Sequence, residues 1–228
     1  MGSYFSTQRI LQTALSVVLV MVSASIHEFG HAYAAYRLGD DTAKRAGRLT
    51  INPLAHIDRF GSLILPLLMG LMGGPIFAFA KPVPYNPRNL RNPRRDEVIV
   101  GFAGPATNIL QAIVGALAAR LYWEIAYMSI VQGGVSYWIY TAFTTYVYVN
   151  CTLAFFNLIP LPPLDGSSII APLLKGEALR KYYVVQRYSL PILMVVLYVL
   201  PGYLHFDPLG IYLDATAGNL AYLLLGWS

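Results

Sequence analysis

Residues 10–38 read ILQTALSVVLVMVSASIHEFGHAYAAYRL, and no other part of the sequence indicates the fold as clearly. No side chain between Ile10 and Ile26 carries a charge. A helix of about 20 apolar residues crosses the hydrocarbon core of a bilayer, which is ~30 Å thick. The stretch is long enough to do so, and the polar group HEFGH at 27–31 continues the same helix. We therefore expect a membrane-spanning helix that also carries the polar side chains of a functional site.

The composition of the whole chain also indicates a lipid environment. Of its 228 residues 56% are hydrophobic and only 12% are charged, whereas soluble domains are about 45–50% apolar and about 25% charged. These values exclude a disordered chain and argue strongly against a soluble globular enzyme. The net charge of +5 comes without a basic run interleaved with aromatics, so we expect no nucleic-acid partner. The single cysteine, Cys151, excludes an internal disulfide and a multi-cysteine zinc site.

Further apolar segments follow the first one. The candidates for additional spans are 98–123, 136–160 and 188–203. The tail at 208–227 carries Asp214 and Asn219 in its middle, so it either spans the bilayer or lies in the interface. We expect an all-α polytopic membrane protein with about four to five transmembrane helices. The whole chain, 1–228, would form one membrane domain, with a core at 10–203 and a tail at 204–228.

The apolar segment 61–80, GSLILPLLMGLMGGPIFAFA, is interrupted by two prolines and three glycines. A helix that ends before Gly73 would measure ~20 Å, which is too short to cross. The segment is therefore predicted to be re-entrant, entering the bilayer and returning to the same side. Its end, FAFAKPV at 77–83, alternates like a strand, as does AGRLTIN at 46–52. The two are predicted to pair as a small β-hairpin at the membrane surface.

The distribution of lysine and arginine favours the re-entrant arrangement. If 61–80 returns to its side of entry, fourteen of the sixteen basic residues share one side, and only Arg9 and Arg120 lie opposite. If it crosses, the bias falls to nine against seven. Cytoplasmic loops carry an excess of lysine and arginine. We therefore expect an integral, multi-pass protein of the cell (plasma) membrane, with its active site toward the cytoplasm.

His27, Glu28 and His31 form an H-E-x-x-H motif. Residues i and i+4 of a helix share a face, so the two imidazoles can hold one metal. The glutamate between them can accept a proton from water. Chance occurrence, or a structural polar cluster, is the alternative. It explains the motif poorly, because ionisable groups inside a membrane helix are costly and mark functional sites by default.

A catalytic zinc site normally has three protein ligands, and the third is sought among Asp165, His56 and His205. Asp165 ends the run NLIPLPPLDG at 157–166, whose prolines must unwind a helix end at membrane depth. Such backbone is tolerated where it is buried in protein or lines a water-filled cavity. Asp165 is favoured on this ground, with an ordinary Asp-Gly surface turn as the alternative. His56 reads as a solvated loop histidine, and His205 is expected on the opposite side.

These motifs, together with Gly104-Pro105-x-x-Asn108 and Asn157-x-x-Pro160-x-x-x-x-Asp165-Gly166, resemble the site-2 protease family of intramembrane zinc metalloproteases. The loops NPLAHIDRFGS and AKPVPYNPRNLRNPRRDE resemble the compact prokaryotic branch of that family, and the likeness covers roughly residues 20–200. It implies one Zn²⁺ per chain, bound by His27, His31 and Asp165, with Glu28 activating water. It also implies cleavage of membrane-embedded protein substrates, often to release a regulator.

Two asparagines are candidates for further roles. Asn157 is a candidate donor to the oxyanion, with a helix-packing amide as the alternative. Asn108 is expected to be structural or to support a metal ligand. Because the peptide carbonyls of a helical substrate are already hydrogen-bonded, we expect the substrate to be unwound before attack. The partners expected are therefore this substrate and the lipid bilayer; the oligomeric state stays open.

A non-proteolytic membrane protein is the main alternative function, either a metal carrier or an inactive relative that binds partners. A carrier is expected to show ligands at several depths and often an internal repeat. The sequence shows one group of ligands and no repeat. An inactive relative is expected to lose Glu28, which is present.

Overall fold

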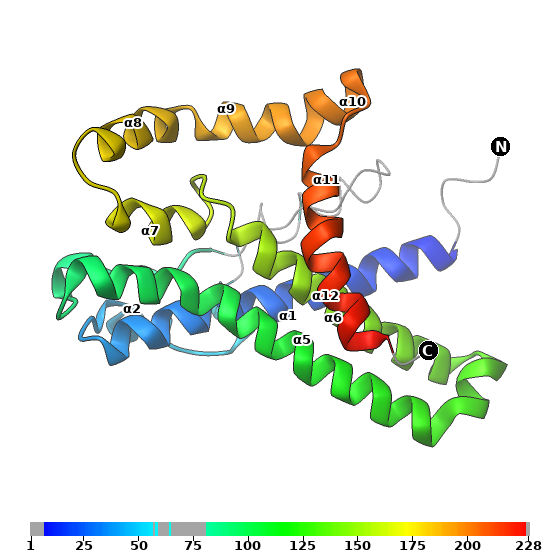
Figure 1. The fold of residues 1–228 in the computed structure, drawn as a ribbon. Helices are drawn as coiled ribbons and strands as arrows, with labels where there is room; N and C mark the ends of the chain where they lie inside the picture. Colours follow the sequence, from blue (N-terminus) through cyan, green and yellow to red (C-terminus); the bar gives the residue numbers. More distant parts are fainter. Residues whose placement is uncertain (1–6, 57, 59–63, 65–80, 227–228) are drawn as a thin grey trace.

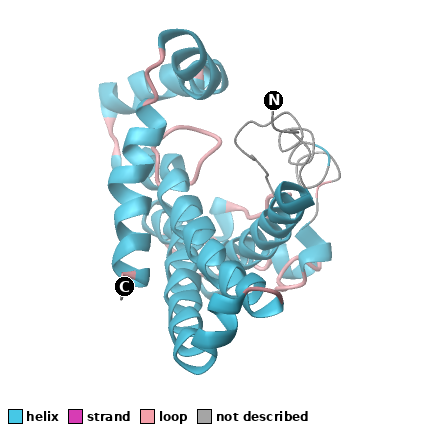
Figure 2. Ribbon diagram, turned by 90° about the vertical axis from the view of Figure 1, so that its right-hand side faces the viewer, coloured by secondary structure: helices cyan, strands magenta, loops and turns pink. Residues whose placement is uncertain are grey.

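The computed structural model describes residues 7–56, 58, 64 and 81–226, and every regular element in that part of the chain is helical (Figure 2). This confirms the expected all-α class. The segment predicted to be re-entrant, 61–80, lies outside the described residues except for Ile64.

Three long helices form the centre of the molecule (Figure 1): α1 (Thr7–Arg37), α5 (Pro93–Gln132) and α6 (Val135–Asn157). We call them the bundle. α5 runs antiparallel to α1, since His31 contacts Val100 whereas Ser23 contacts Gln111. The 40 residues of α5 correspond to ~60 Å, about twice the thickness of the hydrocarbon core. Part of α5 must therefore lie outside that core.

The ends of α5 follow from its sequence. Pro93 stands in the first turn, where its missing N–H costs nothing and its fixed φ suits a helix. Gly133 and Gly134 have φ values of +88° and +73°, a region that residues with a Cβ rarely adopt. These two glycines end α5 and allow α6 to begin at once, so that α5 and α6 form a tight helical hairpin.

Shorter helical elements surround the bundle. Between α1 and α5 lie α2 (Thr42–Arg45), α3 (Pro53–His56) and η2 (Pro87–Asn89). After α6 come α7 (Gly166–Ile170), η3 (Ala171–Leu173) and α8 (Gly176–Arg187). The rest of the chain forms α9 (Ser189–Met194), the π-helical turn η4 (Val195–Val199), α10 (Leu200–Leu204), α11 (Pro208–Leu213), the π-helical turn η5 (Asp214–Gly218) and α12 (Asn219–Leu225).

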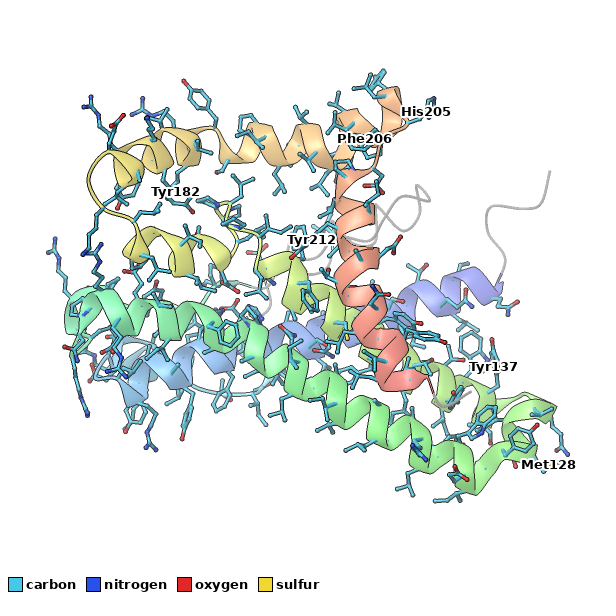
Figure 3. The ribbon with its side chains drawn as sticks, in the orientation of Figure 1. Met128, Tyr137, Tyr182, His205, Phe206 and Tyr212 are labelled. Atoms are coloured by element: carbon cyan, nitrogen blue, oxygen red, sulfur yellow. The ribbon has the colours of Figure 1, made fainter. Side chains whose placement is uncertain are left out.

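We call the stretch from α8 to α10, residues 176–204, the arm. It runs along the top of the view in Figure 1, on the far side of α7 from α5. In Figure 3, Tyr182 marks the beginning of the arm and His205 its far end. The hydroxyl of Tyr182 donates to the carbonyl oxygen of Pro160, at 3.2 Å, and thereby attaches the arm to the turn that follows α6.

The described helices include fewer clear membrane spans than expected. Two are long and apolar enough to cross a membrane, Ile10–Arg37 and Pro93–Gln132. A third is present if Gly176–Arg187 and Pro191–Leu204, which meet at an angle of 60°, count as one span. The segment expected at 136–160 is helical as α6, but α6 is not among the helices that meet these criteria. The number of four to five spans is therefore not confirmed.

The tail packs against the bundle. Ala217 and Ala221 are buried in one apolar cluster with residues of α5 and α6: Ala112, Ala116, Val147 and Cys151. The small alanines allow the helix backbones to approach closely, which is how helices associate in lipid. The hydroxyl of Tyr212 also donates to the Phe155 carbonyl oxygen, at 3.1 Å (Figure 3). The tail is thus an integral part of the helical core.

The predicted β-hairpin is not observed where it can be tested. Residues 46–52 are described and contain no strand, so that half of the prediction is wrong. A side chain, rather than a partner strand, uses the carbonyl oxygen of Thr50, because His56 Nε2 lies 2.8 Å from it. Arg48 likewise donates to the carbonyl oxygen of Lys81, at 2.8 Å. The other half, 77–83, is described only from Lys81 onward.

The flanks of segment 57–80 lie next to each other. The amide N of Lys81 donates to the carbonyl oxygen of His56, at 2.9 Å. Farther out, the amide N of Arg91 donates to the Leu38 carbonyl oxygen, at 3.1 Å. The chain therefore returns at residue 81 to the place that it left at residue 56, and these flanks meet beside the end of α1 that carries the H-E-x-x-H motif.

Candidate metal centre

Helix α1 presents His27 and His31 on one face, one turn apart. Their rings meet edge to face, with centroids 4.7 Å apart and an interplanar angle of 82°. This arrangement brings the two Nε2 atoms to 3.0 Å from each other. Both rings face α5, and His27 is only 6% exposed.

Asp165 reaches the same point from the other end of the chain. α6 ends at Asn157, and the proline-containing turn after it places Asp165 directly before α7. Its Oδ2 lies 3.0 Å from His27 Nε2 and 3.3 Å from His31 Nε2. Among the described residues this is the one group of histidines, cysteines and carboxylates arranged to hold a metal ion. The expected unwinding of the helix end before Asp165 is confirmed.

The three side chains fit a zinc ion. The Nδ1 atoms of both histidines face carbonyl oxygens, Asn108 Oδ1 at 2.5 Å and Val100 O at 2.7 Å, and must therefore donate. In neutral rings each Nε2 then carries a lone pair toward Asp165 Oδ2, a buried atom without a hydrogen-bond partner. Three unpaired acceptors that converge in this way call for a cation. Their separations match the edge of a zinc tetrahedron, about 3.3 Å for bonds of about 2.0–2.1 Å.

Two glycines create the space for this site. A Cβ on Gly104 of α5 would lie 2.6 Å from His27 Nε2 and would also overlap His31, so only glycine allows α5 to pass this close to the rings. A Cβ on Gly166 would lie 2.6 Å from the carbonyl carbon of Ile159. Gly166 thus allows the turn before α7 to fold tightly, which brings Asp165 toward α1.

Glu28 lies between the two histidines in the sequence and is held separately. Its Oε2 accepts a hydrogen bond from the backbone N of Val83, at 2.7 Å. Val83 is buried in a cluster with Ala32 and Ala43, so this donor belongs to a packed segment. The carboxylate of Glu28 is therefore oriented by the chain that follows segment 57–80.

The remaining predicted residues differ in their proximity to this group. Asn108 lies in it, in contact with His27. The Nδ2 of Asn157 donates to the Leu153 carbonyl oxygen of its own helix, at 3.0 Å. His56 is buried against Thr50, so it is not the solvated loop residue that the sequence suggested. His205 ends α10 in the left-handed region with φ of 51° and is exposed.

Sequence reasoning missed a set of buried polar side chains beside the site. Asn150 and Ser23 are fully buried, and Gln111 is 7% exposed. Asn150 Nδ2 donates to Ser23 Oγ, at 2.9 Å, and Tyr146 OH donates to Gln111 Oε1, at 2.6 Å. The signal available in the sequence was the presence of amides within otherwise apolar helices, which are expensive in lipid unless they are paired.

A comparison with known families identifies the chain. The model of Peptidase family M50 matches residues 15–126 and 124–200, which together cover most of the sequence. This protein belongs to peptidase family M50. The resemblance to site-2 proteases that the motifs indicated is thereby confirmed.

Several bacterial relatives align with most of this chain. The "Putative zinc metalloprotease YwhC" of Bacillus subtilis is 38% identical over 185 residues, 81% of this chain and 80% of that protein. The "Putative zinc metalloprotease Rip2" of Mycolicibacterium smegmatis is 31% identical over 218 residues, 91% of this chain and 79% of that protein. Rip2 of Mycobacterium tuberculosis H37Rv is 30% identical over 176 residues, 77% of this chain and 63% of that protein. No solved structure gives a significant match.

Proposed function

We propose that this M50 peptidase is a zinc-dependent intramembrane endopeptidase, which hydrolyses peptide bonds of membrane-embedded protein substrates. The observation that carries the proposal is the convergence of Asp165 with His27 and His31, which lie with Glu28 on a helix apolar enough to span a membrane. The names of the relatives, zinc metalloproteases, agree with this donor set. One ion per chain fits, because the described residues contain one such group.

The chemistry divides among the residues as follows. His27, His31 and Asp165 would hold the zinc ion, which when bound would lower the pKa of water toward ~7 and would polarise the scissile carbonyl. Glu28 accepts the proton of the attacking water at a carboxylate oxygen and later gives it to the leaving amine. The backbone N–H of Val83 donates to Glu28 Oε2 and holds this carboxylate oxygen in place.

Asn157 is the proposed donor to the oxyanion that develops on the scissile carbonyl. Its Nδ2 carries two hydrogens, and the bond to the Leu153 carbonyl oxygen uses one of them. Asn157 lies at the last turn of α6, directly before the turn that carries Asp165. A substrate bound at this turn would have to present an extended, unwound segment, because a helical one keeps its carbonyls hydrogen-bonded.

We further propose that the protein is a multi-pass protein of a prokaryotic cell membrane with its site toward the cytoplasm. The fourteen-to-two distribution of basic residues supports this orientation. The hydrogen bond between the Lys81 amide and the His56 carbonyl oxygen supports entry and return of segment 57–80 on one side. Both flanks of that segment then face the cytoplasm, together with the end of α1 that carries His31.

Cysteine labelling tests this arrangement. Exposed Ile51 and Arg88 stand on opposite flanks of segment 57–80, and each is replaced by cysteine in a Cys151→Ala background. Both cysteines are expected to react with a membrane-impermeant reagent in inverted vesicles and to be protected in intact cells. Labelling of the two from opposite faces would show that the segment crosses the bilayer.

Separate measurements of zinc and of cleavage test the enzymatic proposal. The full-length protein in proteoliposomes should contain about one zinc ion per chain and cleave a membrane-embedded substrate. Glu28→Gln should retain the zinc and lose turnover, because glutamine cannot accept the proton. Asp165→Ala should lose both, and Glu124→Gln, an exposed control on α5, should lose neither. Turnover by Glu28→Gln would refute the assigned mechanism, and zinc binding without any cleavage by wild type would favour a carrier or binding protein.

A further inference from the structure

A chain of hydrogen bonds connects His27 to the interior of the bundle. His27 Nδ1 lies 2.5 Å from Asn108 Oδ1, and Asn108 Nδ2 donates to Asn150 Oδ1, at 2.8 Å. Asn150 Nδ2 donates to Ser23 Oγ, at 2.9 Å, and to the backbone carbonyl oxygen of Tyr146, at 2.9 Å. Ser23, Asn108 and Asn150 are all fully buried, and they come from the three different helices α1, α5 and α6.

The direction of every hydrogen bond in this series follows from the bond between Asn150 Nδ2 and the Tyr146 carbonyl oxygen. The backbone carbonyl oxygen of Tyr146 can only accept, so Asn150 must turn its NH₂ group toward it and its Oδ1 toward Asn108. Asn108 must then donate to that oxygen through Nδ2, which leaves its own Oδ1 facing His27. Since Oδ1 can only accept, His27 must donate from Nδ1. The backbone of α6 thus decides which nitrogen of His27 carries the proton.

We propose that Asn150 is a positioning residue for the metal centre, which holds His27, through Asn108, in the Nδ1–H tautomer with Nε2 presented to the metal. The inference rests on the proposed function only in assuming that the His27, His31 and Asp165 group binds zinc. Asn150 belongs to none of the motifs from which the family resemblance was drawn, and its hydrogen bonds go to Asn108, Ser23 and Tyr146, none of which is a proposed metal ligand.

A comparison with His31 shows why the orientation of Asn108 must be fixed. The Nδ1 of His31 bonds to the carbonyl oxygen of Val100, a backbone group that can only accept and whose orientation helix α5 fixes. The partner of His27 is instead a side-chain amide, which can rotate and offer either a donor or an acceptor. Without Asn150, rotation of Asn108 would place its NH₂ group against Nδ1 and move the proton of His27 to the metal-binding nitrogen. Asn150 therefore fixes the orientation of the Asn108 amide, so that its oxygen accepts from His27 in the way that the Val100 carbonyl oxygen accepts from His31.

The first test compares zinc affinity among variants of two neighbouring buried residues of α6. Asn150→Leu removes the fixed orientation and should weaken zinc binding by about 10–100-fold, the range for lost hydrogen-bond partners of metal-ligating histidines. Asn150→Asp keeps an oxygen that accepts from Asn108 and should recover most of the loss. Cys151→Ala, at a fully buried position without this link, should lower thermal stability while it leaves zinc affinity unchanged. Affinity is measured by competition with a chromogenic chelator on the full-length protein in detergent.

A second pair of variants applies if Asn150→Leu does not fold. Ser23→Ala removes one of the two hydrogen bonds that hold the Asn150 amide, so the Tyr146 carbonyl oxygen alone restrains it. The less firmly held amide should weaken zinc binding about 2–10-fold, a smaller loss than that expected for Asn150→Leu. Ser25→Ala is the matched control, because within the described part of the chain the hydroxyl of Ser25 donates to the Met21 carbonyl oxygen of its own helix, at 2.7 Å, and not to Asn150. Equal zinc affinity in the two serine variants would overturn the proposal.

The tautomer itself provides a readout that packing alone would not move. In zinc-loaded protein with ¹⁵N-labelled histidine, the Nδ1–H proton of His27 should exchange slowly in wild type and faster in Asn150→Leu. Its exchange should be slow again in Asn150→Asp. Unchanged exchange in Asn150→Leu, or equal loss of zinc affinity in Asn150→Leu and Cys151→Ala, would assign Asn150 to packing. Because these readouts need zinc but no substrate, they remain decisive even if wild type cleaves nothing.

Discussion

The bundle and the arm are both apolar, but they differ in what they bury. The bundle encloses polar side chains: Ser23, His27, Asn108, Gln111 and Asn150. The arm, residues 176–204, exposes large apolar side chains along its length and buries only Ser189 and Leu193 among its described side chains. In Figure 1 the bundle helices lie against each other, whereas the arm runs apart from them along the top of the view. In the middle of the arm, Leu193 packs against Phe156 and Leu164. An apolar sequence therefore does not by itself decide which helices of this protein pack.

The physical reason is the solvent. In lipid, apolar side chains gain little by leaving the hydrocarbon, so helix association depends on close packing of small residues and on hydrogen bonds between helices. The bundle has both, with Gly104 and Ala112 at contacts between helices and Asn150 linking α6 to α1 and α5. The arm has neither among its described contacts beyond Tyr182. Substitutions should therefore be costly in the bundle and nearly silent at the exposed positions of the arm.

The largest effect is expected from a single methyl group at Gly104. Gly104→Ala should abolish zinc binding and cleavage, because the new Cβ would overlap both imidazole rings. Gly202→Ala in the arm is the matched control, since its Cβ would meet nothing within 4 Å. That variant should bind zinc like wild type, as judged by metal content after gel filtration. Full zinc occupancy in Gly104→Ala would show that α5 can move away from the site at little cost.

The next effect is expected at the end of the bundle, where α6 meets the turn to Asp165. Asn157→Ala should retain zinc but lose roughly 10²–10³-fold in kcat, if its amide donates to the oxyanion. Initial rates on a membrane-embedded substrate in proteoliposomes check this expectation. Near-normal turnover would leave the Leu153 contact as the whole role of Asn157.

A smaller effect is expected at Asp40, which ties the loop after α1 to the chain before α5. Its carboxylate accepts from Thr42 Oγ1 at 2.5 Å, Asn86 N at 2.7 Å and Asn89 Nδ2 at 2.8 Å. Burial raises the pKa of Asp40, but these hydrogen bonds outweigh it and hold the pKa below its ordinary value. Asp40→Asn should lower the free energy of unfolding by about 1–3 kcal/mol at neutral pH.

The pH dependence of this effect has a definite sign. Because the pKa of Asp40 is lower in the folded state, its contribution is complete above the unfolded value of about 3.9 and is lost as pH falls through the lower folded value. The stability difference between wild type and Asp40→Asn should therefore be constant between pH 5 and 7 and shrink below about pH 4. Denaturant titrations in mild detergent measure it. A difference that grows on acidification would contradict the assigned hydrogen bonds.

The smallest effects distinguish two valines. Val147 in α6 is fully buried and Val195 in η4 is 44% exposed. Val147→Ala should reduce the free energy of unfolding by about 1–2 kcal/mol, through the cavity that it leaves. Val195→Ala should change it by less than about 0.5 kcal/mol. Equal losses would mean that the arm is packed as tightly as the bundle, and the comparison would fail.

Local patterns were sufficient to predict much of the site. The spacing of His27 and His31 needs only the helical repeat, and the prolines before Asp165 unwind the chain wherever it folds. Asn108 was expected as a structural or supporting residue, and it contacts His27. His56 was misread because its burial depends on the packing of the loop around it, and the strand at 46–52 was wrong because side chains use the carbonyl oxygens that a partner strand would need.

The sequence by itself determined that this chain lies in a membrane and that it is helical. It also determined that the chain carries two histidines, a glutamate and an aspartate suited to zinc-dependent hydrolysis. Those properties depend on composition, on the 3.6-residue repeat and on the chemistry of single side chains. Only the tertiary structure decided that Asp165 meets the histidines and that Asn150 directs Asn108 toward His27. These contacts depend on the register of α1, α5 and α6. Two features set that register: close contact between helix backbones at single glycines, and the few hydrogen bonds that buried amides can make. Neither feature leaves a periodic signal in the sequence.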